Sequence, residues 1–109
     1  VLSGDLHATG HALIRSSSDV MLDSAVHAIL TGPIGTRRGW PSASRGTPPV
    51  LAAGINADTP APVSERNGFT LIDLRQDEAK IQLFAWRNEP VEVIDTLKPY
   101  HSYTVERRS

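Results

Sequence analysis

The sequence predicts a mainly β fold, because short runs of β-forming residues recur between turn signals. After the turn signal Asn67-Gly68 come three such runs, separated by a few polar residues: Phe69–Arg75, Ala79–Arg87 and Val91–Leu97. The first 36 residues hold further short apolar runs that end at glycine or proline. We therefore expect little helix, a β-meander over 68–109, and a fourth strand within the last ten residues.

The first region, 1–36, contains three strand-like runs: Val1–Ser3, His11–Ser16 and Ala25–Gly35. A polar turn at Ser16–Asp19 separates the last two runs. By residue type alone, 19–30 is compatible with a helix. Gly32 and Pro33 close this run before a helix would reach its typical length, so we favour a strand.

The middle region, 37–67, is rich in proline and glycine and predicts a long loop. It holds Pro41, Pro48, Pro49, Pro60 and Pro62 together with Gly39, Gly46 and Gly54. Loops beyond about 12 to 15 residues are usually functional or disordered, and Trp40 is costly to leave wholly in water. We expect Trp40–Ser44 and Val50–Ile55 to pack or to form a short helical turn.

The meander predicted over 68–109 has apolar residues on both of its faces. Phe69 and Leu71 fall on one face of the first run, and Ile72 and Leu74 fall on the other. A sheet with one solvated face alternates more cleanly. We expect another layer to cover the second face, and self-association of the chain where that layer is absent.

Composition excludes several classes of function. The 109 residues carry a net charge of −1, with 39% hydrophobic and 21% charged residues, which favours a globular domain and gives no basic field for nucleic acid. Cysteine is absent, so disulfides and thiolate metal sites are excluded. No apolar run approaches the roughly 20 residues of a membrane span, so none is expected.

The opening residues VLSGDLH (1–7) resemble the last metal-binding motif of the calcineurin-like metallophosphoesterases. That motif, usually written GHxH, follows an apolar strand as it does here. The stretches HAILTGPIGT and GFTLIDL…KIQLFAWR also resemble the C-terminal strands of bacterial members. The resemblance implies the C-terminal half of an α/β sandwich whose dinuclear centre of Mn, Fe or Zn hydrolyses phosphomonoesters or phosphodiesters.

The resemblance also implies the roles of three residues. His7 corresponds to the second histidine of the motif and binds one metal ion, and Asp5 stands where most members have the first histidine. A carboxylate is a sound ligand for Mn, Mg or Fe, and residues two apart on an extended segment point the same way. His11 is expected at the rim, touching the phosphate-ester substrate. His27 and His101 are expected to be ordinary histidines, partly buried or at the surface.

Other ligand motifs of this family, among them Gly-Asp-x-x-Asp and Gly-Asn-His-Asp/Glu, do not occur in the chain. We therefore expect a C-terminal segment that is inactive alone and whose partner is the missing N-terminal part of the same domain. The alternative is a non-catalytic β-sandwich module that mediates interactions and has no metal chemistry.

Overall fold

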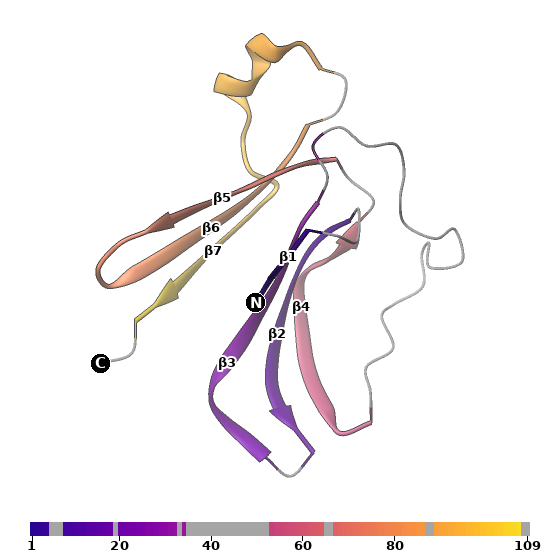
Figure 1. Ribbon diagram of the computed structural model, residues 1–109, viewed down its shortest axis with the longest axis vertical. Coiled ribbons are helices and arrows are strands. Elements are labelled where there is room, and N and C mark those ends of the chain that lie inside the picture. Colours follow the sequence, from indigo (N-terminus) through magenta and orange to yellow (C-terminus); the bar gives the residue numbers. More distant parts are fainter. Residues whose placement is uncertain are drawn as a thin grey trace.

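The computed structural model describes residues 1–4, 8–18, 20–32, 34, 53–64, 67–86 and 89–107. Strands hold 67% of these residues and helix 8%, and the strands form two sheets (Figure 1). The prediction of a mainly β fold is confirmed. Among the described residues, no helix is long and apolar enough to cross a membrane.

The first sheet has four strands in the order β1-β3-β2-β4: β1 (Leu2–Ser3), β2 (Thr9–Ser17), β3 (Val20–Thr31) and β4 (Ile55–Ser64). Strand β1 runs parallel to β3, with Leu2 opposite Ile29, whereas β2 is antiparallel to both β3 and β4. The strand interpretation of the run before Gly32 is confirmed. Gly32 ends β3 at a φ of 75°, a conformation that glycine adopts without steric cost.

Strand β4 corrects part of the loop predicted for 37–67, because residues 55–64 pair with β2. The prolines Pro60 and Pro62 made this run look irregular. Within the described sheet β4 pairs with β2 alone, so it is an edge strand. The β2–β4 pairing shifts register between Asp58 and Ala61 and again between Ala61 and Ser64, and an edge strand tolerates proline at such irregularities. The packing expected for Trp40–Ser44 and for residues 50–52 lies outside the described residues.

The second sheet is an antiparallel meander of β5 (Gly68–Leu74), β6 (Glu78–Ala85) and β7 (His101–Glu106). The first two strands lie where the sequence predicts them. Strand β7 is the strand expected within the last ten residues. The turn between β5 and β6 is closed by the amide of Arg75, which donates to the carbonyl of Glu78 at 2.8 Å.

The strand predicted at Val91–Leu97 is wrong, because residues Val91–Thr96 form a short 3-10 helix, η2. Pro90 precedes it with a φ of −55°, and its carbonyl accepts a hydrogen bond from the amide of Val93 at 3.1 Å. The Thr96 hydroxyl donates to the carbonyl of Val93 at 2.9 Å. These local bonds satisfy backbone groups that a strand would have to pair with a neighbour, and η2 has no buried residue.

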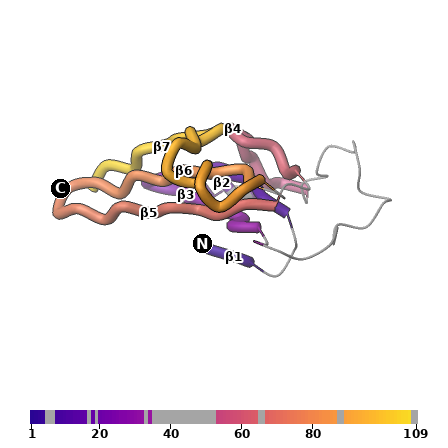
Figure 2. The backbone as a smooth tube through the Cα atoms, turned by 90° about the horizontal axis from the view of Figure 1, so that it is seen from above, coloured from indigo at the N-terminus to yellow at the C-terminus, as the bar shows by residue number. Residues whose placement is uncertain are grey.

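The two sheets meet over a small apolar core. Ile29 and Ala61 of the first sheet pack with Ile81 and Leu83 of the second, and Ile72 and Val105 lie against this cluster. Seen from above, the second sheet lies in front of β2 and β3 (Figure 2). The packed inner faces explain why each sheet needs apolar residues at alternate positions.

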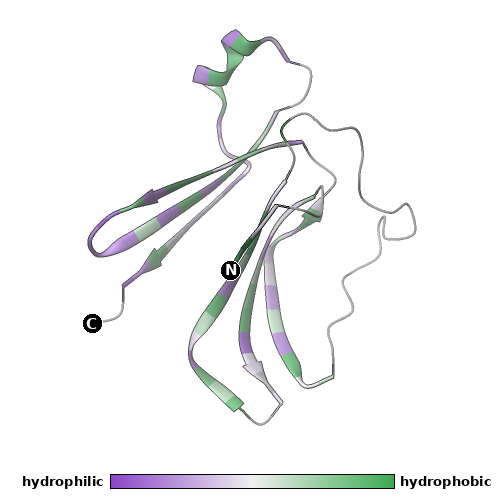
Figure 3. Cartoon of the chain, viewed as in Figure 1, coloured by the Kyte–Doolittle hydropathy of each residue, from purple (hydrophilic) through white to green (hydrophobic). Residues whose placement is uncertain are grey.

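Away from this core the strands of the two sheets diverge (Figure 1). At strand ends far from the core, Met21 and Leu74 are 80% and 76% exposed. Along the strands of the first sheet, apolar residues are interspersed with polar ones (Figure 3). On the outer face of the second sheet, the rings of Phe69 and Phe84 stack at 4.8 Å, while Leu71 remains half exposed.

Leu83→Ala should lower the free energy of unfolding by about 2 to 5 kcal/mol, because Leu83 is fully buried where the two sheets meet and its loss leaves a cavity. Leu71→Ala is the matched control at an exposed strand position, and should cost less than about 1 kcal/mol. Urea unfolding followed by circular dichroism measures both. Equal costs for the two variants would contradict the packing described above.

Candidate functional site: a buried histidine cluster

Three histidines from three strands lie in one hydrogen-bonded series. The Nδ1 atom of His11 on β2 is 2.9 Å from Nε2 of His101 on β7. Its Nε2 atom is 3.0 Å from Nδ1 of His27 on β3. We call His11, His27 and His101 the histidine cluster. It links the two sheets, because β2 and β3 belong to the first sheet and β7 to the second.

Strand alternation places these side chains on the inner faces. His11 lies opposite Ile29, and His27 is two residues from Ile29 along β3, so both point to the side of this buried residue. His101 lies opposite Leu83, which is also buried between the sheets. The histidine cluster therefore continues the inter-sheet core as a polar row.

Aromatic contacts shield His11 from water, while His27 and His101 are partly buried. The ring of Tyr103 on β7 meets the His11 ring edge-on at 4.9 Å and the His27 ring at 5.2 Å. Beside them the hydroxyl of Tyr100 donates a hydrogen bond to the Thr9 hydroxyl at 2.7 Å. As a result His11 is only 2% exposed, and it is one of the largest fully buried side chains of the described residues.

Burial keeps the cluster uncharged. Loss of hydration, together with charge repulsion from the nearby His101 and His27, lowers the pKa of His11 to about 4. Burial also lowers the pKa of His101, and burial followed by the Val1 ammonium group lowers that of His27. At neutral pH each ring therefore has one N–H donor and one free nitrogen acceptor, which suits a series of three rings.

The geometry does not make the cluster a site for a single metal ion. The two nitrogens of His11 point to different partners on opposite sides of its ring, so the three side chains do not converge on one point. Among the described residues, no group of three or more His, Cys, Asp or Glu side chains is placed to hold a metal ion. The cluster is instead a series of hydrogen bonds from ring to ring.

Two of the predicted site residues, Asp5 and His7, lie outside the described residues. The structure describes both ends of the segment that holds them. Strand β1 ends at Ser3, whose carbonyl accepts a hydrogen bond from the Thr31 hydroxyl at 3.3 Å, and β2 begins at Thr9. The strand expected over Val1–Ser3 is present at Leu2–Ser3.

The third predicted site residue, His11, is described, and its surroundings are other histidines. Its Nδ1 atom lies within hydrogen-bonding distance of His101 and its Nε2 atom within that of His27, and its side chain is buried. Contact of His11 with substrate stays a prediction, and it would require these hydrogen bonds to open. Sequence reasoning treated His27 and His101 as isolated residues, whereas the fold brings both of them to His11.

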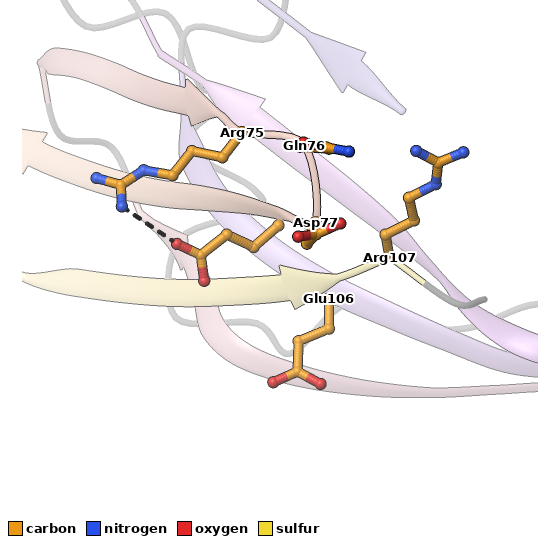
Figure 4. Close-up of a pocket in the computed structure, with 6 residues that line it drawn as sticks. Arg75, Gln76, Asp77, Glu106 and Arg107 are labelled. Carbon is orange, nitrogen blue, oxygen red and sulfur yellow. Dashed lines mark ion pairs between the residues drawn. The ribbon is translucent and has the colours of Figure 1, made fainter.

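A second feature is an open pocket at the turn between β5 and β6 (Figure 4). Its lining is polar and of mixed charge: Arg75, Gln76, Asp77, Glu78, Glu106 and Arg107. Arg75 pairs with Glu78 at 3.7 Å and with Asp73 at 3.1 Å. Arg75 is thus paired within the chain, and the lining as a whole carries charges of both signs.

Comparisons with known proteins give no relative: no family model, no curated protein and no solved structure matches the chain.

The stability of the fold should fall as the pH is lowered from about 6.5 to about 4. His11 has a pKa near 6.5 when unfolded and about 4 when folded, so the unfolded chain binds more protons in this window. The stabilisation that comes from keeping His11 neutral in the folded state is fully present above the unfolded pKa. It is lost progressively down to the folded pKa, by up to about 3 kcal/mol.

Urea unfolding of the wild type and of His11→Gln across this pH range measures that contribution. Glutamine keeps a donor and an acceptor but does not titrate, so His11→Gln should show the shallower loss of stability with acid. Carboxylates titrate in both proteins and cancel in the comparison. Parallel curves for the two proteins would mean that His11 is not held neutral by burial.

Proposed function

We propose that this chain supplies a metal-ligand loop and part of the β-sandwich of a calcineurin-like metallophosphoesterase. Such an enzyme hydrolyses phosphomonoesters or phosphodiesters with a metal-activated water. One observation carries the proposal: the apolar strand β1 ends directly before Gly4-Asp5-Leu6-His7, and the chain after this segment forms a two-sheet β structure.

The ends of the proposed ligand loop are fixed by the first sheet, which supports the proposal. Strand β1 pairs with β3, and the side chain of Thr31 binds the carbonyl of Ser3. A Cβ atom on Gly4 would lie 3.2 Å from the Thr31 hydroxyl, so glycine suits this close approach. At the other end Ala8 and Thr9 are buried. A ligand loop benefits from such supports, because metal ligands have to be held in position.

The donor set of the loop fits a divalent metal ion. His7 would bind through a neutral ring nitrogen and Asp5 through a carboxylate oxygen, and the carboxylate favours Mn or Fe over softer ions. When bound, the metal ions supply a water of lowered pKa and neutralise charge on the phosphoryl oxygens. Two donors do not complete a dinuclear centre, so further ligands have to come from another part of the same domain.

The exposed apolar residues support such a partner. Met21 and Leu74 lie largely in water where the two sheets diverge, and Leu71 is half exposed on the second sheet. Another layer of protein would remove these apolar side chains from water. We propose that the N-terminal part of the same domain covers them and carries the other ligands. Without it, the same surfaces favour self-association.

The purified 109-residue chain should not hydrolyse a generic aryl phosphate in the presence of Mn. The reason is the number of ligands, since Asp5 and His7 supply fewer donors than a dinuclear centre needs. Release of the chromogenic alcohol measures turnover. Activity that His7→Ala abolishes would show that the chain is catalytically complete and would contradict the proposed division of the site.

The decisive test uses the complete protein encoded by the open reading frame that contains these residues. His7→Ala should lower both kcat and bound metal at least about 10 to 100-fold, because loss of a residue that merely orients a ligand already costs that much. Asp5→Ala should lower metal content as well. Elemental analysis and turnover are measured together.

Two further variants control this test. His11→Gln should keep the metal, because His11 lies in the buried cluster and is not proposed as a ligand. Asp5→His restores the usual motif, and should keep metal bound while changing which ion gives the highest activity. Full metal content in both His7→Ala and Asp5→Ala would refute the ligand loop and favour the non-catalytic β-sandwich module.

A further inference from the structure

The histidine cluster is a main polar contact between two sheets that otherwise share a small core. His11 reaches from β2 to His101 on β7, next to the hydrogen bond from Tyr100 to Thr9. The apolar part of the contact is the cluster of Ile29, Ala61, Ile81 and Leu83. Beyond it the strands diverge (Figure 1). A change in the charge of the histidine cluster therefore changes the strength of the contact between the two sheets.

The series of three rings can hold one additional proton without losing a hydrogen bond. When all three rings are neutral, each hydrogen bond has one N–H and one acceptor nitrogen. If His11 gains a proton, both of its nitrogens donate, one to His27 and one to His101, and both bonds persist.

A second proton cannot be accommodated in this way. Two charged rings and one neutral ring carry five N–H groups on six nitrogens, and the two bonds use four of those nitrogens. At least one bond then has two N–H groups facing each other at a distance of 2.9 or 3.0 Å. Repulsion between the two like charges adds to this loss, and burial strengthens it.

The groups around the cluster provide no compensation for positive charge. Tyr103 of β7 faces His11 and His27 with its aromatic ring, and the Val1 ammonium next to β1 opposes charge on His27. From β2 and β4, Arg15 and Asp58 pair with each other at the surface. The other acidic and basic groups of β3, β5, β6 and β7 are exposed or half exposed: Asp23, Asp73, Glu78, Lys80 and Glu106.

We propose that the histidine cluster is an acid-sensitive latch between the two sheets, which opens when the cluster binds a second proton. Opening separates β7 from β2 and β3 while the strands within each sheet stay paired. It uncovers the inner faces around His11 and Tyr103, and closure restores them when the proton is released. The latch is independent of the proposed metal chemistry.

The absence of cysteine makes the latch directly measurable. Ser24→Cys on β3 and Thr104→Cys on β7 place two nitroxide labels on exposed positions of different sheets. Asp73→Cys with Thr104→Cys places both labels within the second sheet. Between about pH 7.5 and about pH 3.5, a range that passes the folded pKa of His11, the distance measured by electron spin resonance should lengthen for the first pair and stay constant for the second. An unchanged first pair, or lengthening of both pairs, would overturn the proposal.

The double variant His27→Gln/His101→Gln separates the latch from general acid expansion. It retains His11 alone and so binds at most one proton in the cluster, and its inter-sheet distance should stay constant over the same pH range. Equal lengthening in the wild type and this variant would overturn the latch.

If that double variant does not fold, a measurement on the wild-type protein tests the latch instead. Nuclear magnetic resonance follows the imidazole Cε1–H signals of the three histidines through the same titration. The lengthening of the inter-sheet distance should follow the second protonation of the cluster. Separation of the sheets at the first protonation would contradict the count of N–H groups above.

Discussion

The burial of His11 is the constraint on which the meeting of the two sheets depends. An imidazole that is 2% exposed has to find hydrogen-bond partners within the protein, or it costs about 1 to 3 kcal/mol per unpaired group. His27 supplies one partner from the next strand, and His101 supplies the other from the opposite sheet. An apolar contact tolerates sliding, whereas these two bonds are directional. The histidine cluster therefore fixes how the sheets lie on each other.

Local patterns predicted the strands whose neighbours in sequence are also their neighbours in space. β5 and β6 form a hairpin, and β2 and β3 form another, so turn residues and apolar runs were sufficient. The failures at β4 and η2 share a cause. Proline forbids a paired central strand, but the edge position that admits Pro60 and Pro62 is set by the whole sheet. At Val91–Thr96, apolar residues suggested a strand, while Pro90 and local hydrogen bonds favoured a 3-10 turn.

The histidine cluster could not be predicted from sequence for a related reason. His11 and His101 are 90 residues apart, and their contact needs both the pairing of β7 with β6 and the packing of one sheet on the other. Alternation alone shows only that His11 and Leu13 share a face of β2. That signal predicts a buried position, but it does not show which partner satisfies the ring. The proposed motif at Asp5 and His7 is the opposite case, since its signal is a short string that lies outside the described residues.

Strand β2 connects the two proposals. It begins two residues after His7, and its third residue is His11, so the proposed ligand loop and the histidine cluster share one rigid support. Both require neutral imidazole, but for different reasons. A metal-binding histidine has to be deprotonated to use its lone pair, and acid releases the metal. The cluster histidines are neutral because burial disfavours their charged form. Under both proposals, acidification would weaken metal binding at the loop and the contact that holds β2 against the second sheet, each through the protonation of a different imidazole.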